Sequence, residues 1–174
     1  TKNREVVRRS NGTLASYKPL KSRSKYLVDR LIPSVYKPLS QRKFDQYTQL
    51  PETSNPQALQ FGQQLRVEHS DNYQYAQAVL GHFNQNNYFY TLKTAILGKD
   101  SIDEFLFTTR EGYCEHYATA FVFLMRAGNV PARAVGGYLG GEINPFEDYV
   151  RVRELDAHAW AEIWVEDKGW VRVD

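Results

Sequence analysis

The only cysteine of this 174-residue chain, Cys114, stands where a turn-like run changes into a strongly apolar helical pattern. The apolar residues that follow have helical spacing: Tyr117, Ala118, Phe121, Val122, Leu124 and Met125. We therefore predict a helix over residues 113–127 with the thiol at its N-terminus. Unpaired N–H groups and the helix dipole favour a thiolate there, and the thiolate is the nucleophile in cysteine chemistry. A lone cysteine in a helix is also commonly inert core, so its position alone does not define a site.

Two strand-like segments near the end of the sequence, residues 157–165 and 170–174, read as a β-hairpin around the turn at 167–169. Because side chains alternate along a strand, an odd-length loop places His158 and Asp174 on one face. An aspartate beside a histidine fixes the ring tautomer and stabilises the imidazolium, which in turn holds a neighbouring cysteine as thiolate. The parts of a Cys–His–Asp triad are therefore present.

These motifs, in this order, resemble the transglutaminase-like superfamily. The matching stretches are Gly112-Tyr113-Cys114 followed by Ala118, His158-Ala159-Trp160-Ala161-Glu162, Gly169-Trp170-Val171-Arg172-Val173-Asp174, and the helix-to-strand passage 125–138. The resemblance spans residues 60–174 and implies Cys114 as nucleophile, His158 as base and Asp174 as its orienting partner. The sequence around Cys114 and the strand-like segment that precedes the core are most similar to those of bacterial membrane-anchored TgpA-type proteins.

Proteins of that type carry a transglutaminase-like domain on the outer side of the cytoplasmic membrane, between membrane-spanning segments. The resemblance thus implies a periplasmic or extracytoplasmic domain of an inner-membrane protein. Residue 1 is Thr and the sequence stops at Asp174, so we expect a soluble fragment of a longer, membrane-anchored protein. A single cysteine is compatible with that location.

The order of elements predicts an α+β fold: a papain-like core, with the nucleophile helix packed on an antiparallel sheet, after a small β-rich N-terminal extension. We place the extension at residues 1–53 and the catalytic core at 54–174. Strands are expected at 5–8 and 13–17, around an Asn11-Gly12 turn, at 26–32 and in a run ending at 47–50. In the core, helices are expected at 56–68, 71–84 and 101–107, with an extended segment at 88–92.

Composition limits the other classes of function. One cysteine excludes an internal disulfide and Cys–Cys metal pairs, and His69, His82 and His116 form no familiar zinc motif. Neither a phosphate-binding loop nor an EF-hand loop occurs, so we expect no cofactor and no metal. Residues 1–50 carry twelve Lys or Arg against three Asp or Glu, and the rest is acidic. We interpret this basic extension as a solvated face or a patch against another part of the full protein, ahead of membrane-surface attraction, and expect no nucleic acid partner.

Several further residues are candidates for the walls of the site. Alternation puts Trp160 on the His158 face, where it would shield an ion pair from water, while Trp164 and Trp170 are interpreted as structural. Tyr113 and His116 are assigned to the site wall or to substrate contact; His116 lies two residues along the helix and points away from Cys114, so it is not the base. The Cys114 N–H is one expected oxyanion donor. The second donor is open among Tyr88, Tyr90 and Asn87.

The leading hypothesis is acyl transfer from a protein glutamine to a primary amine through a thioester on Cys114, with deamidation when water attacks. Its partners would be proteins or peptides that offer glutamine and lysine or another amine, with cell-envelope components among the candidates. A second hypothesis is a cysteine peptidase or amidase with the same triad, because the first half-reaction is shared. A third is a non-catalytic module that binds peptides or cell-wall material and carries a vestigial triad.

Overall fold

The computed structural model describes residues 6–8, 14–17, 19, 21, 38–146 and 149–174, and it divides into two compact units, 1–34 and 35–174. In the first unit, strands β1 (Val6–Arg8) and β2 (Leu14–Ser16) pair antiparallel. This confirms the two strands of the predicted hairpin. Its Asn11-Gly12 turn and the strand predicted at 26–32 lie outside the described residues.

The second unit begins with a helix where the sequence predicted a strand. Residues Gln41–Thr48 form α1, so the prediction of a strand ending at 47–50 is wrong. Local bonds favour the helix, because the Gln41 amide donates to the Asp45 carboxylate one turn later. The Tyr47 ring also packs edge-on against Trp170, with centroids 4.7 Å apart. The boundary predicted at 53–54 lies in the stretch from Pro51 to Pro56 and stays a prediction; α1, which precedes it, packs on α5 and β5.

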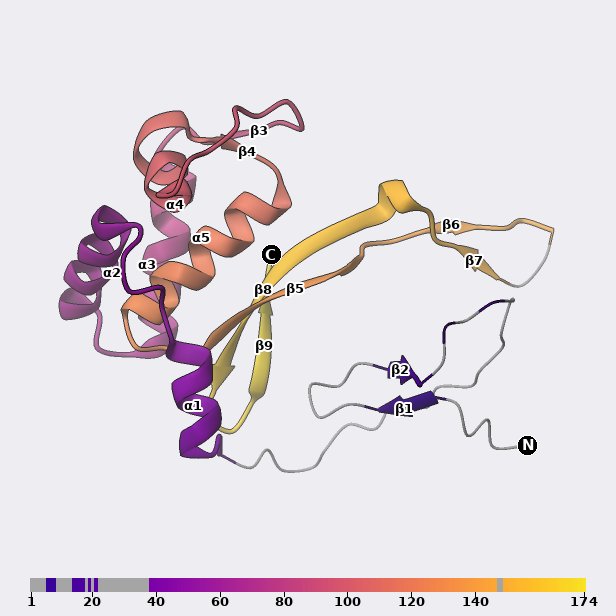
Figure 1. Cartoon of the computed structure of the whole chain (residues 1–174), viewed down its shortest axis with the longest axis horizontal. Coiled ribbons are helices and arrows are strands. Elements are labelled where there is room, and N and C mark those ends of the chain that lie inside the picture. The colour runs from indigo at the N-terminus through magenta and orange to yellow at the C-terminus, as the bar shows by residue number, and fades with distance from the viewer. Residues whose placement is uncertain (1–5, 9–13, 18, 20, 22–37, 147–148) are drawn as a thin grey trace. The chain divides into compact units, whose positions relative to one another are not determined.

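The helices of the core agree with the sequence predictions. They are α2 (Pro56–Glu68), α3 (Asn72–Gln85), the short α4 (Ser101–Asp103) continuing into a π-helical stretch (Glu104–Thr109), and α5 (Cys114–Ala127). The Asp71 carboxylate caps α3 by accepting from the N–H groups of Tyr73 and Gln74 at 2.9 Å. Figure 1 shows these helices gathered on one side of the long strands.

Two buried polar residues lock the start of α2 to α4. The Asp103 carboxylate accepts from the N–H groups of Gln57 and Ala58, and the Asn55 amide oxygen accepts from those of Ile102 and Asp103. Asn55 and Asp103 are both 4% exposed, so each satisfies donors that would otherwise be buried without a partner. The segment that leads to Cys114 is thereby anchored to α2.

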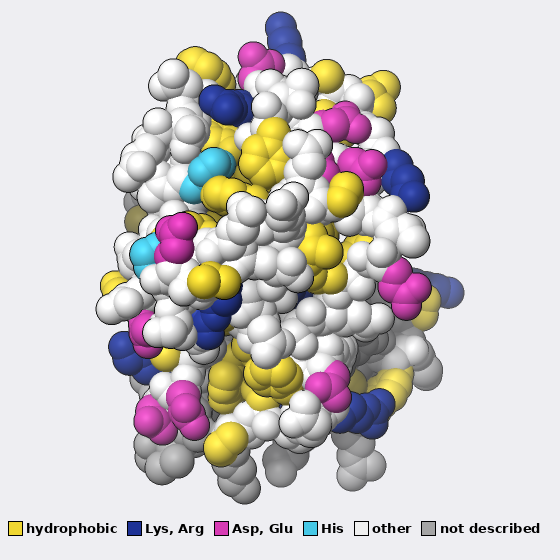
Figure 2. Space-filling model, turned by 90° about the vertical axis from the view of Figure 1, so that its left-hand side faces the viewer, with side chains coloured by type: hydrophobic (Ala, Val, Ile, Leu, Met, Phe, Trp, Pro, Cys, Tyr) yellow, Lys and Arg dark blue, Asp and Glu magenta, His cyan; other side chains and the backbone are white. Residues whose placement is uncertain are grey.

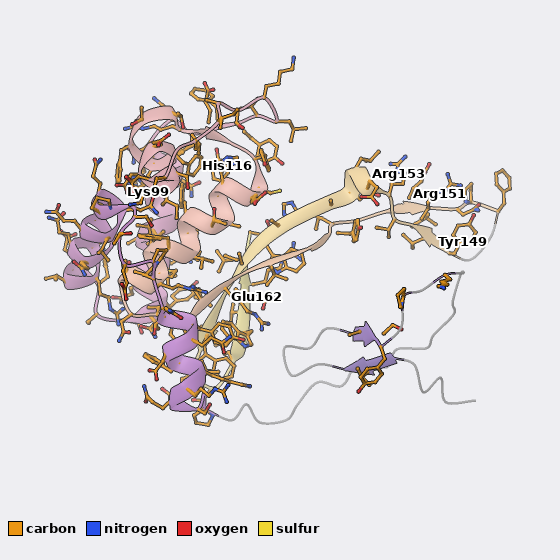
Figure 3. All side chains as sticks on the ribbon, viewed as in Figure 1. Lys99, His116, Tyr149, Arg151, Arg153 and Glu162 are labelled. Atoms are coloured by element: carbon orange, nitrogen blue, oxygen red, sulfur yellow. The ribbon has the colours of Figure 1, made fainter. Side chains whose placement is uncertain are left out.

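An antiparallel sheet in the order β5-β8-β9 supports α5; its strands are Ala132–Tyr138, Ala157–Val165 and Gly169–Val173. Two short pairs complete the topology. Parallel β3 (Phe89–Tyr90) and β4 (Glu111–Gly112) precede α5, and antiparallel β6 (Glu142–Ile143) and β7 (Val150–Arg151) extend the β5–β8 pair. The labelled Tyr149, Arg151 and Arg153 lie along this extension, away from the helices (Figure 3).

Helix α5 is the centre of the core. Its buried side chains are Ala118, Ala120, Phe121, Val122, Phe123, Leu124 and Met125, and it packs against β8, β5, α2 and α3. On β8 the buried partners are Ala161 and Ile163. The exposed helical face in Figure 2 mixes acidic, basic and apolar side chains, as a solvated surface does.

The contact between α2 and α5 requires a glycine. A Cβ on Gly62 would lie 2.7 Å from the Cβ of Ala127 on α5. We predict that Gly62→Ala lowers the free energy of unfolding by roughly 1–3 kcal/mol, measured by urea denaturation, because the helices must move apart.

Gly81→Ala in α3 is the matched control. A Cβ there meets only the Gln85 amide nitrogen at 3.8 Å, so alanine should raise stability by up to about 1 kcal/mol through its helix propensity. Equal stability of the two variants would contradict the proposed close approach.

Candidate active site

The candidate nucleophile begins α5. A backbone turn at Arg110, with a φ of 54°, precedes β4, and β4 enters the helix through Tyr113. The parallel pairing of β3 with β4 holds this entry in place, because the Phe89 N–H donates to the Arg110 carbonyl at 2.8 Å. Cys114 is half-buried and is not in a disulfide. Its helix start agrees with the sequence prediction.

His158 and Asp174 are brought together by the β8–β9 hairpin. The register pairs Ala161 with Val173, so Asp174 follows onto the face that carries His158. His158 Nε2 lies 2.7 Å from Asp174 Oδ1, and the imidazole donates this hydrogen bond when the proton is on Nε2. Nδ1 is then left for a second partner. The predicted same-face arrangement of the two residues is confirmed.

Cys114, His158 and Asp174 all line one cavity of about 370 Å³. Its lining is Leu80, Phe83, Asn84, Tyr88, Tyr90, Cys114, Tyr117, Ala118, Phe121, His158, Ala159, Trp160, Ala161, Val173 and Asp174. No hydrogen bond joins the Cys114 thiol to His158 in the described part of the chain. They line a common cavity without being hydrogen-bonded to each other.

An aromatic cluster forms one wall of this cavity. The rings of Phe83, Tyr88 and Tyr117 lie 5.1–6.1 Å apart, and Tyr90 stacks on Tyr117. Burial raises the pKa of Tyr88 to about 12 and also raises that of Tyr117, so both stay neutral phenols. The Tyr88 hydroxyl donates to the Leu106 carbonyl at 2.8 Å, which fixes this wall.

His82 supports the same wall from α3. Its Nε2 contacts the Tyr88 hydroxyl at 3.1 Å, and its pKa is lowered, first by burial and then by the charge of Arg110. A neutral ring suits this position, since one ring nitrogen faces the Asn86 amide and the other faces Tyr88. His82 is therefore a structural residue that supports this wall through Tyr88.

A second layer surrounds the His–Asp pair. Partial burial opposes ionisation of Asp174, but hydrogen bonds and charges from Arg172 and His158 outweigh it and leave the pKa of Asp174 below its ordinary value. The indole of Trp160 lies nearly parallel to the His158 ring, with centroids 6.4 Å apart. Trp160 is thus a wall of the site, as the sequence predicted. Arg172 was missed, although its spacing of two from Asp174 on a strand was a signal.

Tyr113 and His116 occupy a different cavity, of about 320 Å³, together with Phe105 and Glu115. Side chains one residue before and two residues after Cys114 leave the helix in other directions, so the structure does not bring them to the Cys114 cavity. His116 sits near the upper end of α5 in Figure 3, its ring 4.5 Å from that of Tyr113. Their role in substrate contact stays a prediction.

Within the described ranges, no group of three or more His, Cys, Asp or Glu side chains is placed to hold a metal ion. No helix in those ranges has the length and apolarity to cross a bilayer.

Cys114 at a helix start and a hydrogen-bonded His–Asp pair on an antiparallel sheet thus line one cavity of a papain-like fold. Residues 59–174 match the family model of the transglutaminase-like superfamily, and the chain belongs to that superfamily.

The chain is similar to a protein-glutamine gamma-glutamyltransferase of Pseudomonas aeruginosa strain PAO1, with 46% identity over 126 residues, or 72% of this chain and 19% of that protein. It is 31% identical over 134 residues to the uncharacterized protein YebA of Bacillus subtilis strain 168, covering 73% of this chain and 18% of YebA. The chain therefore spans less than a fifth of these relatives.

Among solved structures, the periplasmic domain of TgpA from Pseudomonas aeruginosa matches with a TM-score of 0.75 and 43% identity, over 78% of this chain and 47% of that one. A putative cysteine protease from Cytophaga hutchinsonii matches with a TM-score of 0.54 and 22% identity, over 78% and 42% of the two chains. That second likeness concerns the fold alone. Together they confirm the predicted α+β, papain-like fold.

The site predicts a thiol whose reactivity depends on one particular histidine. We expect iodoacetamide to alkylate Cys114 rapidly at neutral pH, and His158→Ala to slow that reaction at least tenfold, because the imidazolium holds the thiolate. His69→Ala is the matched control and should keep the wild-type rate, since His69 follows α2 and lines neither this cavity nor the one that holds His116. Equal rates in both variants would contradict the pairing.

Proposed function

We propose that this chain is the catalytic core of a cysteine acyltransferase that transfers the acyl group of a protein glutamine to a primary amine. The observation that carries the proposal is the His158–Asp174 hydrogen bond in the cavity that Cys114 lines. The family assignment supports an enzyme, and the name of the Pseudomonas relative supports glutamine as acyl donor.

The reaction divides into two half-reactions. His158 takes the thiol proton, and the Cys114 sulfur attacks the carboxamide carbon to give a tetrahedral intermediate. The imidazolium returns this proton to the leaving nitrogen, ammonia departs and a thioester remains. An amine then attacks the thioester, His158 takes one of its protons, and that proton reprotonates the thiolate as the isopeptide forms. Water in place of the amine gives glutamate.

The second oxyanion donor is assigned to Tyr90 among the three candidates. Tyr90 pairs in the parallel β3–β4 ladder with Gly112, which is two residues before Cys114 in the sequence. Tyr90 also lines the cavity that Cys114 lines. Its hydroxyl makes no hydrogen bond to another described residue. Tyr88 is less suitable, because its proton is committed to the Leu106 carbonyl. Asn87 is not in the cavity lining.

The substrate enters an apolar site. Apart from Cys114, His158 and Asp174, the lining of the cavity consists of uncharged residues, and most of them are apolar or aromatic. Such a surface suits a neutral carboxamide flanked by apolar side chains better than a charged acyl donor. The partners are therefore proteins or peptides that present glutamine, with a lysine or small amine as second substrate.

The place of action is part of the same proposal and is inferred from the relative. The matched TgpA structure is that of a periplasmic domain. We place this core on the extracytoplasmic side as well, as part of a longer membrane-anchored protein whose substrates include cell-envelope proteins.

The proposed function is tested by assaying amine transfer and peptide cleavage side by side. We expect a fluorescent primary amine to be incorporated into a glutamine-containing peptide, and Cys114→Ser to abolish incorporation. Cleavage of the peptide bond without incorporation would establish the peptidase alternative. If the protein catalyses neither reaction but binds the peptide tightly, it is a non-catalytic module.

Two tyrosine variants test the assignment of Tyr90 as an oxyanion donor. Tyr90→Phe should lower kcat for amine transfer about a hundredfold, because one donor to the developing oxyanion is lost. It should leave alkylation of Cys114 by iodoacetamide unchanged, since that reaction forms no oxyanion. Tyr88→Phe should reduce stability and keep kcat within about threefold. A Tyr90→Phe enzyme with wild-type kcat would remove this residue from the mechanism.

A further inference from the structure

Arg172 on β9 contacts the part of Asp174 that His158 leaves free. The two oxygens of the carboxylate have different partners: Oδ1 faces His158 Nε2, and Oδ2 accepts a hydrogen bond from Arg172 Nη2. Because both oxygens are held, rotation of the carboxylate about its terminal bond would break one of the two bonds. The orientation of the oxygen that His158 uses therefore depends on Arg172.

The same guanidinium also covers Trp160. Its central carbon lies 4.2 Å from the indole centroid, and the His158 ring lies nearly parallel to the same indole, with centroids 6.4 Å apart. Arg172 thus joins two neighbours of the imidazole, one that hydrogen-bonds it and one that lies beside its plane. The Arg172 side chain is 40% exposed, so its ion pair with Asp174 adds little to global stability.

A second cluster on the same sheet has the same parts without the histidine. Arg133 pairs with Glu162 through two hydrogen bonds, at 2.8 and 2.5 Å, and its guanidinium lies 4.2 Å from the Trp170 centroid. Glu162 is labelled on β8 in Figure 3. Arg133 is not in the cavity lining, and it reaches the site only through Glu162, whose Oε1 accepts a hydrogen bond from the Trp160 indole N–H at 3.3 Å. Arg133→Gln is therefore a control that weakens the support of Trp160 while it leaves both oxygens of Asp174 held.

We propose that Arg172 is a positioning residue for acyl transfer: by holding one oxygen of Asp174 and the face of Trp160, it fixes the imidazole of His158 toward Cys114. The inference rests on the proposed function of the triad. Arg172 itself is not among the residues that line the cavity, so it acts through Asp174 and Trp160 and not on the substrate.

The test compares Arg172→Gln, Arg172→Lys and Arg133→Gln. Arg172→Gln should lower kcat for amine transfer about tenfold or more while KM for the glutamine peptide stays within twofold, because chemistry and not binding is impaired. Arg172→Lys keeps the charge but lacks the planar fork, and should restore part of kcat. Arg133→Gln leaves the bonds of Asp174 to His158 and Arg172 in place, so it should keep kcat within twofold and lose stability instead.

A readout that needs no activity accompanies the kinetics. The downfield proton resonance of the His158 Nε2–H in its bond to Asp174 should broaden or vanish in Arg172→Gln and persist in Arg133→Gln. If both arginine variants keep that resonance and the wild-type kcat, the inference is overturned. If the wild-type protein itself transfers no amine, the proposed function fails, and the resonance still decides whether Arg172 orders the His–Asp pair.

Discussion

The packing of α5 against the β5-β8-β9 sheet is the constraint on which the rest of the structure depends. Seven side chains of α5 are buried, and Ala161 and Ile163 of β8 are buried with them. At roughly 1.5–3 kcal/mol for each large apolar side chain, this burial is a major source of stability in the core. The same packing positions the site, because contact between α5 and β8 holds Cys114 and His158 at one cavity.

The sequence was informative where local rules and burial agree. The apolar period of α5 and the alternation of β8 and β9 predicted the helix start at Cys114 and the common face of His158 and Asp174, and both are confirmed. Three loop residues between β8 and β9 suffice to fix that register. The helix or strand that carries each of Cys114, His158 and Asp174 was therefore predictable from its own neighbours in sequence.

Features that depend on distant partners could not be predicted. Helix α1 has no buried residue and is held by the packing of Tyr47 on Trp170, so tertiary contact overrode the strand-like reading. The mutual caps of Asn55 and Asp103 join residues far apart in sequence. Cross-strand neighbours were equally hidden: only the folded structure shows that the Arg172 guanidinium lies over Trp160 and that Tyr90 pairs with Gly112.

Trapping the acyl-enzyme tests the central claim most directly. The protein would be mixed with a glutamine peptide in the absence of amine, quenched in acid and measured by intact-mass spectrometry with peptide mapping. The account predicts an adduct of the peptide mass less ammonia on Cys114, which hydroxylamine releases and Cys114→Ser lacks. An adduct that retains only the part of the peptide before a cleaved bond, or none at all while the thiol remains open to alkylation, would contradict it.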